Sequence, residues 1–352
     1  MLPDILDLSA DGLRAVAASA GLKPFGAGQI YTWLYQQGVT SFDEMTNVSG
    51  AARAALAAAY RVGALENVAQ QEAADGTTKF LFRLFDGLQV ETVMIPADRR
   101  DHGPRRTVCI STQAGCAMGC TFCRTATMGL ARHLSAAEIL AQVLAVRRLL
   151  VARGERLSNV VLMGMGEPLH NYDPTMQALR IMVDPKGIGL APRRVTLSTV
   201  GLVPGIRKFA TEHLGVKLAL SLHATTDDVR RTLIPMAKKY PLDEIFAACR
   251  DFCRTQPRRG EVVTLEYLML RMVNDTEADA HRLVKIAAHV PSKVNLIPLN
   301  PYPGCPWERP EEERIENFAN ALRAKGVQVN IRHSRGQDIL AACGQLAVGN
   351  RD

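Results

Sequence analysis

Strand-like and helical patterns alternate over the last two thirds of this chain, and this alternation limits its fold more than any other feature. The strand-like stretches are TVCIST (107–112), NVVLMGM (159–165), RVTLSTV (194–200), VKLALSLHA (216–224), VVTLEYLML (262–270) and VNLIPLN (294–300). Strands that alternate with helices predict a parallel sheet with helices outside. Six strands are too few for an eight-stranded closed barrel, so we expect an α/β fold with an open, partial (βα)6 barrel.

Two further patterns complete the expected barrel. A seventh strand-like stretch, VQVNIRHS (327–334), is expected at the edge of the sheet. The clearest helix begins at Ser135, with Glu138 three residues later as in a capping box, and ends at Gly154. Functional loops of such a fold lie at the C-terminal ends of its strands.

The chain before this alternation has other patterns. Amphipathic stretches predict a small helical accessory domain, and TKFLFRLF and LQVETVMIP around Asp86-Gly87 predict a β-hairpin. A polar loop flanked by Arg99, Arg100, Arg105 and Arg106 marks the expected domain boundary. The expected division is an N-terminal helical accessory domain (1–75), a hairpin extension (76–101), a partial barrel (102–335) and a C-terminal segment (336–352).

Charge and hydropathy narrow the class of protein. No apolar run approaches the roughly 20 residues that span a bilayer, and acidic residues occupy the N-terminus where a signal peptide would be basic. We therefore expect a cytoplasmic protein with no membrane partner. The net charge of +7 suits an anionic partner such as nucleic acid. Basic pairs that could contact phosphates are Arg105-Arg106, Arg193-Arg194, Arg230-Arg231, Lys238-Lys239 and Arg258-Arg259.

Three of the eight cysteines crowd into one short loop after the first barrel strand. Cys116, Cys120 and Cys123 have the spacing C-x3-C-x2-C. Three thiolates can hold three irons of a 4Fe–4S cube and leave the fourth iron open. An open iron can bind S-adenosylmethionine and pass an electron into its sulfonium. The alternative is a zinc-stapled, non-catalytic RNA-binding protein in which Cys109 is the fourth ligand.

This loop resembles the signature of the radical S-adenosylmethionine enzymes. The second strand is followed by Gly166-Glu167-Pro168, which is similar to the family's element for the amino group of S-adenosylmethionine; alone, it would read as an ordinary turn. Segments along the whole chain resemble the 23S ribosomal RNA adenine-C2 methyltransferases and the related C8 methyltransferases. They are GLKPFGAGQIYTWLY (21–35), DEMTNVS (43–49), QVETVMIP (89–96), CISTQAGCAMGCTFC (109–123), VLMGMGEPLHNY (161–172), RRVTLSTVGLVP (193–204), LALSLHA (218–224), NLIPLNP (295–301) and DILAACGQL (338–346).

The resemblance implies roles for three further residues. Adenine C2 is electron-poor, so a carbon radical can add to it where a simple methyl displacement would fail. Cys343 matches the family's methyl carrier, which forms a transient protein–RNA crosslink, and Cys109 matches the cysteine that resolves it through a disulfide. Glu91 matches the base that removes the C2 proton. Without the resemblance these would read as two buried cysteines and a solvent-facing strand residue.

The resemblance also implies ligands and partners. The implied contacts to S-adenosylmethionine are Gly166, Glu167, Ser198, Ser221, Leu222, His223 and Asn300. The implied cofactors are one 4Fe–4S cluster and two molecules of S-adenosylmethionine per turnover, one as methyl donor and one as radical source. The implied partners are 23S rRNA and an electron donor such as flavodoxin or ferredoxin, and we expect a monomer. A tRNA adenosine beside the anticodon and C8 regiochemistry are both open from the sequence, and Cys249, Cys253 and Cys305 have no assigned role.

Overall fold

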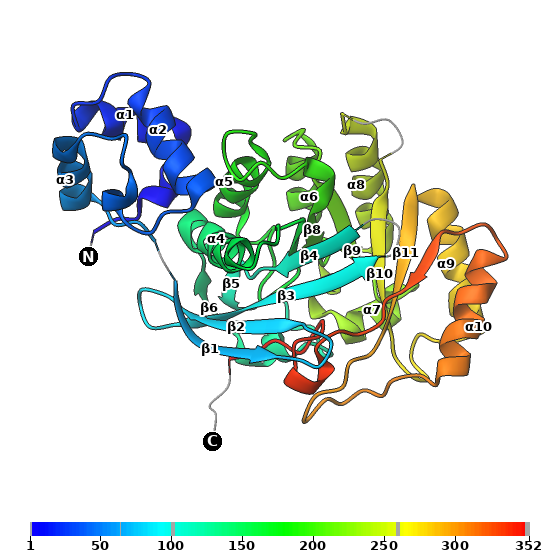
Figure 1. The fold of residues 1–352 in the computed structure, drawn as a ribbon. Coiled ribbons are helices and arrows are strands. Elements are labelled where there is room, and N and C mark those ends of the chain that lie inside the picture. The colour runs from blue at the N-terminus through cyan, green and yellow to red at the C-terminus, as the bar shows by residue number, and fades with distance from the viewer. Residues whose placement is uncertain (1, 64, 100–102, 258–260, 349–352) are drawn as a thin grey trace.

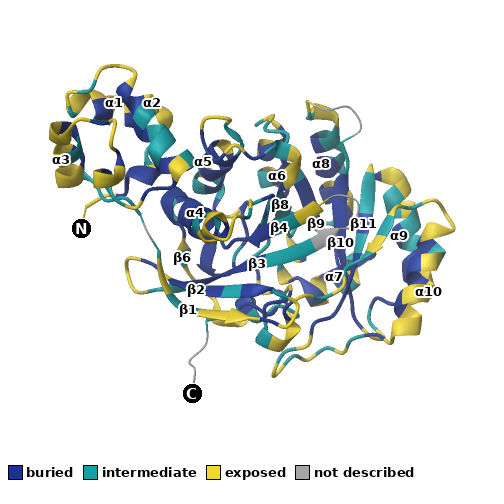
Figure 2. Ribbon diagram, viewed as in Figure 1, coloured by how far each residue is buried: buried dark blue, intermediate teal, exposed yellow. Residues whose placement is uncertain are grey.

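The computed structural model describes residues 2–63, 65–99, 103–257 and 261–348 (Figure 1). Helices gather at the N-terminus, and a curved sheet with outer helices forms the rest. The strands of this sheet and the helices beside them hold most of the buried apolar side chains (Figure 2).

The N-terminal helices are α1 (Ala10–Ser19), α2 (Gly26–Thr32) and α3 (Gly50–Ala59). A serine precedes α1 and α3, and each serine side chain accepts a hydrogen bond from an N–H of the first helical turn. Such caps supply partners for donors that a helix leaves unpaired at its start. Leu13, Ile30, Leu34 and Leu56 are buried between the helices. The predicted helical character of this region is confirmed up to α3.

The prediction is wrong for the end of that region, where residues expected to be helical form strand β1 (Glu66–Glu72). β1 pairs antiparallel with β2 (Thr78–Arg83) at the edge of the sheet. Its sequence, ENVAQQE, has little apolar alternation, and most of its side chains are exposed. Backbone pairing with β2 stabilises this strand, and such pairing leaves no local sequence signal.

The predicted hairpin is confirmed as β2 and β3 (Gln89–Arg99), joined by a turn in which Gly87 has a φ of 88°. β3 continues antiparallel to β4 (Gly103–Cys109), with Arg99 opposite Gly103. Arg100, within the expected boundary loop, lies outside the described residues. The strands on both sides of that loop are hydrogen-bonded neighbours, so the hairpin and barrel share one sheet.

The strands of the barrel run parallel from β4 onward. They are β7 (Asn159–Leu162), β8 (Val195–Thr199), β9 (Lys217–Ser221), β10 (Val263–Met269), β11 (Ser292–Pro298) and β12 (Val329–Ile331). The sheet order is β1-β2-β3-β4-β7-β8-β9-β10-β11-β12, and within the described residues no ladder joins β12 back to β4. The expected open barrel is confirmed, and β12 is the expected seventh strand.

Helices α4 to α10 connect the strands and cover the outside of the barrel (Figure 1). They are α4 (Ala136–Ala152), α5 (Tyr172–Val183), α6 (Val203–Ala210), α7 (Asp227–Leu233), α8 (Leu242–Thr255), α9 (Glu277–His289) and α10 (Glu312–Arg323). α4 begins with the predicted capping box, in which Ser135 and Glu138 exchange side-chain to backbone hydrogen bonds. Within the described residues, no helix has the length and apolarity needed to cross a membrane.

The C-terminal segment returns to the hairpin extension after β12. Gly336 donates its N–H to the carboxylate of Asp75, and Asp338 accepts one from the N–H of Ala74. Ala347 donates its N–H to Glu91 on β3. These contacts bring the last described residues against the strands that precede the barrel.

Candidate active site

The cysteine loop (residues 115–123) begins at the end of β5 (Gln113–Gly115), which pairs with β6 (Leu130–His133) in a short two-stranded sheet. Cys116 donates its N–H to the carbonyl of Gly129 at 2.7 Å. Gly115 has a φ of 80°, and a Cβ there would lie 1.9 Å from that same carbonyl oxygen. The close approach therefore requires glycine, and it holds the start of the loop against β6.

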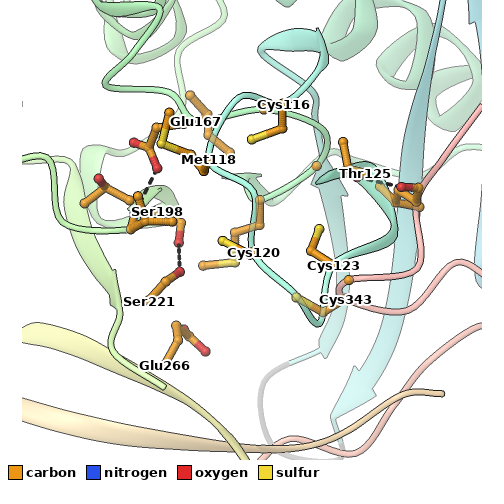
Figure 3. Close-up of a pocket in the computed structure, with 18 of the residues that line it drawn as sticks. Cys116, Met118, Cys120, Cys123, Thr125, Glu167, Ser198, Ser221, Glu266 and Cys343 are labelled. Atoms are coloured by element: carbon orange, nitrogen blue, oxygen red, sulfur yellow. Dashed lines mark hydrogen bonds between the residues drawn. The ribbon is translucent and has the colours of Figure 1, made fainter. Parts of the chain in front are cut away.

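The three thiols of this loop line one cavity, which we call the cluster cavity (Figure 3). Its empty space, counted together with the open mouth, is about 840 Å³. Burial raises the pKa of Cys116 to about 12 and that of Cys120 well above its usual value. The thiols therefore stay neutral until a metal centre lowers their pKa.

The donor set fits a four-iron cluster. Among the described residues, no three His, Cys, Asp or Glu side chains converge closely enough to hold one metal ion. In a 4Fe–4S cluster each thiolate binds a different iron. Three cysteine sulfurs that surround a cavity can therefore bind such a cluster without converging on one point. Cys109, the fourth ligand in the zinc alternative, does not line the cluster cavity.

The segment after β7 forms one wall of this cavity with Gly166 and Glu167. Glu167 is buried, and its carboxylate accepts N–H bonds from Leu169 at 3.1 Å and Val200 at 2.8 Å. Burial raises the pKa of Glu167 to about 7. A Cβ on Gly166 would meet Gln113 at 2.6 Å, so the glycine lets this wall approach the strand before the cysteine loop.

Ser198, Ser221 and His223 form the wall at the ends of β8 and β9. The two serine hydroxyls lie 3.4 Å apart, and Figure 3 shows both beside Cys120. His223 has a φ of 56°, and its Nδ1 accepts the N–H of Leu268. Burial lowers the pKa of His223 to about 3, so the imidazole is neutral. A strained backbone at the end of a barrel strand is typical of functional sites.

Two of the residues expected to contact the cofactor do not line the cluster cavity. The side chain of Leu222 is fully buried and does not line the cluster cavity. Asn300 lines a neighbouring cavity, where its Nδ2 donates to the carbonyl of Cys343 at 3.3 Å. Asn300 also accepts hydrogen bonds from Ser334 and Gln337, so it fixes the C-terminal segment.

The neighbouring cavity, which we call the cysteine-pair cavity, is lined by both Cys109 and Cys343. Cys343 also lines the cluster cavity, and Figure 3 shows its side chain beside Cys123. Gly344 accepts the N–H of Arg124, which ties the C-terminal segment to the end of the cysteine loop. Cys343 therefore lies between the cluster ligands on one side and Cys109 on the other.

Glu91 lines neither cavity and lies on β3, against the C-terminal segment. Its Oε1 is 3.1 Å from the ammonium group of Lys79, and its Oε2 accepts the N–H of Ala347 at 2.9 Å. Burial raises the pKa of Glu91, and the nearby charge of Lys79 opposes that rise. The carboxylate is thus buried against the segment that carries Cys343, and the alternative of a solvent-facing residue is wrong.

Comparisons with known proteins agree with this geometry. Residues 3–62 match the family described as the ribosomal RNA large subunit methyltransferase N-terminal domain, and residues 110–284 match the radical SAM superfamily. The dual-specificity RNA methyltransferase RlmN of Acidiphilium cryptum is 47% identical over 350 residues, covering 97% of this chain and 88% of the relative. The chain belongs to the RlmN family of radical SAM enzymes.

Two further matches support this assignment. RlmN of Anaeromyxobacter is 46% identical over 350 residues, covering 98% of this chain and 90% of the relative. A crystal structure of a radical SAM methyltransferase from Sphaerobacter thermophilus is 44% identical, with a TM-score of 0.91, and covers 98% of this chain and 99% of that one. This RlmN-family chain is therefore a radical SAM methyltransferase, and its family implies a 4Fe–4S cluster and S-adenosylmethionine.

Sequence reasoning missed two charged residues of this RlmN-family site. Glu266 on β10 and Arg332 after β12 line the cluster cavity, and Arg332 also lines the cysteine-pair cavity. Glu266 is the single charged residue of the apolar stretch VVTLEYLML, and Arg332 is the single arginine of the expected strand VQVNIRHS. A charged residue in a strand expected to be buried is itself a signal for a functional site.

The remaining cysteines and basic pairs separate into different environments. Cys249 is fully buried in α8, and the thiol of Cys253 donates to the carbonyl of Pro291 at 3.7 Å. Cys305 packs beside the small apolar cluster that contains Cys120. The expectation that Arg230 contacts phosphates is wrong, because its side chain is only 1% exposed. The pair at 258–259 lies outside the described residues.

Proposed function

We propose that this RlmN-family chain methylates C2 of an adenosine in 23S rRNA, and that a tRNA adenosine beside the anticodon is a second substrate. The match of residues 3–62 to a ribosomal RNA methyltransferase domain supports the first substrate. The relatives' name, dual-specificity RNA methyltransferase, supports a second RNA. We assign RNA binding to the N-terminal domain (1–75) and catalysis to the partial barrel (102–335). The compartment would be the cytoplasm, where both RNAs occur.

The position of Cys343 carries this proposal. Its side chain lines both the cluster cavity and the cysteine-pair cavity. A methyl carrier needs access to S-adenosylmethionine on one side and to its resolving thiol on the other. The geometry thus supports a carrier role for Cys343 and a resolving role for Cys109.

Cys116, Cys120 and Cys123 would hold the cluster, whose open iron supplies an electron to S-adenosylmethionine and so generates the radical. A flavodoxin or ferredoxin would deliver that electron to a monomeric enzyme. Glu167, Ser198 and Ser221 would bind the cofactor, since they line the same cavity. The neutral side chain of His223 would pack beside it.

The Cys343 thiolate would first attack the methyl group of one S-adenosylmethionine, forming a thioether and releasing S-adenosylhomocysteine. A second S-adenosylmethionine, cleaved to methionine, would supply the 5′-deoxyadenosyl group that takes one hydrogen atom from this methyl group and leaves as 5′-deoxyadenosine. The methylene carbon on the Cys343 sulfur would then bond to adenine C2. Glu91 would remove the C2 proton while one electron passes from the adduct back to the oxidised cluster. The Cys109 thiolate would then attack the Cys343 sulfur, so that an S–S bond replaces the S–C bond and the released carbon takes a proton.

Replacing single residues tests these roles. We expect Cys343→Ala to keep the cluster and lose all methyl transfer, and Cys109→Ala to accumulate enzyme covalently bound to RNA. Glu91→Gln should also accumulate the crosslink, because the C2 proton is not removed. Denaturing gels of anaerobic reactions with labelled S-adenosylmethionine detect each species. Normal turnover by Cys109→Ala would contradict the resolving role.

Product analysis tests the regiochemistry. Mass spectrometry of nucleosides from a treated 23S fragment should show 2-methyladenosine. Detection of 8-methyladenosine instead would assign the chain to the related C8 activity. A purified protein that is colourless and holds zinc would overturn the radical mechanism.

A further inference from the structure

Arg230 is a buried cation without an acidic partner. It lies in α7, its side chain is 1% exposed, and no Asp or Glu among the described residues forms an ion pair with its guanidinium. Its partners are backbone carbonyls: Nε donates to Leu222 at 3.1 Å, and Nη2 donates to Ser221 at 3.3 Å and to Val200. Burying a charge costs several kcal/mol unless an opposite charge offsets it. The position of Arg230 therefore implies a negative partner.

The carboxylate nearest in sequence does not fill this role. Asp227 begins α7, and its Oδ1 accepts the N–H of Leu242 at 2.9 Å. Its charge acts on Arg230 from a distance, without an ion pair. Burial accordingly lowers the pKa of Arg230 to about 10, although the group stays protonated at neutral pH.

The cysteine loop packs directly on the helix that carries Arg230. Thr121 donates its N–H to the carbonyl of Leu233, the last residue of α7, at 3.0 Å. Cys120 shares a small apolar cluster with Leu233 and Ala224. Val200 and Ser221, whose carbonyls accept hydrogen bonds from Arg230, line the same cavity as Cys120. Arg230 does not line the cluster cavity, so it is separated from the cofactor by the strand ends that it holds.

We propose that Arg230 is the fixed positive charge that offsets the iron–sulfur cluster bound through Cys120, and that it raises the reduction potential of that cluster. A 4Fe–4S²⁺ core with three thiolates has a net charge of −1, and one-electron reduction makes it −2. A nearby buried cation stabilises the more negative state, because a low dielectric screens the attraction weakly. This inference rests on the cluster of the proposed function, but it does not depend on the RNA substrate.

The test compares Arg230→Gln with Arg230→Lys in the full chain, reconstituted anaerobically to equal iron and sulfide content. Dye-mediated titration with dithionite, followed by electron paramagnetic resonance without S-adenosylmethionine or RNA, gives the midpoint potential. Arg230→Gln should lower the midpoint potential. At the wild-type midpoint potential, the ratio of reduced to oxidised cluster should fall at least about tenfold, which corresponds to 59 mV for one electron. Arg230→Lys keeps the charge and should remain close to the wild type.

Arg147→Gln is the matched control. Arg147 is also partly buried, and it donates to the carbonyls of Tyr35 at 2.7 Å and Gln36 at 2.8 Å, beside the N-terminal domain. Losing it should weaken the fold without changing the potential. An equal shift in this control would show that Arg230 acts only through stability and would overturn the proposal.

Asp227→Asn gives a test of opposite sign that does not require Arg230 to be removed. Asparagine can still accept the N–H of Leu242, but its loss of negative charge should raise the potential. If Arg230→Gln does not fold, a potential that is unchanged or lowered in Asp227→Asn overturns the proposal by itself. Absence of 2-methyladenosine in RNA assays would contradict the proposed function and leave these potentials unaffected.

Discussion

Replacing Lys79 by methionine should destabilise the fold and do so more strongly at high pH. The Lys79 ammonium lies 3.1 Å from Glu91, and the two side chains are only 11% and 7% exposed. Lys79 also donates to the carbonyl of Leu340 at 3.4 Å, so it joins β2 to the C-terminal segment. After the substitution, the Glu91 carboxylate keeps one N–H donor, from Ala347, and loses its ion-pair partner, so that only the weaker attraction of Arg124 remains.

Removing one partner of a buried ion pair costs about 3–5 kcal/mol, because the other charge stays buried and unpaired. We expect the lower end, about 3 kcal/mol at pH 8, since the Ala347 N–H still stabilises the carboxylate. Burial raises the pKa of Glu91, and loss of Lys79 raises it further. A carboxyl group whose pKa is higher in the native state than in the unfolded state stabilises the native state when it is protonated. The free energy of unfolding therefore falls as the pH rises through the folded pKa. The cost of Lys79→Met should therefore shrink on acidification.

Urea denaturation between pH 5 and pH 8, with equal cluster content in each variant, measures this cost. A double-mutant cycle with Glu91→Gln isolates the pair: the double variant should be more stable than the sum of the single changes predicts. The reasoning is refuted if Lys79→Met costs less than about 1 kcal/mol at pH 8, or if its cost is the same at every pH.

Three further predictions concern the start of the cysteine loop, His223 and the buried Gln142. Gly115→Ala should prevent cluster loading, because its Cβ would lie 1.9 Å from a backbone oxygen. Gly304→Ala is the control: Gly304 also has a φ of 80°, but its Cβ would meet nothing within 4 Å, so this variant should lose about 1 kcal/mol of stability and keep the iron. Because burial lowers the pKa of His223 to about 3, stability should fall by up to about 1.4 kcal/mol per pH unit as the pH drops below about 6.5, and His223→Asn should reduce that slope in urea denaturation. Gln142→Leu should cost about 3 kcal/mol in the same assay, because Gln142 bonds both the N–H and the carbonyl of Ser111; a cost below 1 kcal/mol would contradict this.

Local sequence patterns predicted the elements whose residues carry their own signal. The alternation of apolar strands and helices is a property of neighbouring residues, so the barrel strands and the capped start of α4 were predictable. β1 was missed because its ENVAQQE sequence is polar, and only its pairing with β2 makes it a strand. The three cysteines of the loop were equally accessible, since their spacing lies within one short segment.

The same limit applies to the site. The proximity of Cys109 to Cys343 depends on how the C-terminal segment packs against β3 and the cysteine loop. Leu222 and Asn300 follow β9 and β11, yet neither lines the cluster cavity, whereas Ser198 and Ser221 on β8 and β9 do. Neither effect leaves a local pattern, and the resemblance to a family suggested the cysteine roles without their geometry.

Arg230 and Arg231 show most clearly what the sequence determined and what the tertiary structure decided. The two adjacent arginines cannot be told apart from the sequence alone. The sequence determined their positive charge, the helix around them and the loop of three thiols. The fold buried Arg230 under the strand ends and left Arg231 exposed in an ion pair with Asp228. Residue type and spacing follow from bonded neighbours, but burial and electrostatic environment arise from contacts between distant parts of the chain, and these exist only after packing.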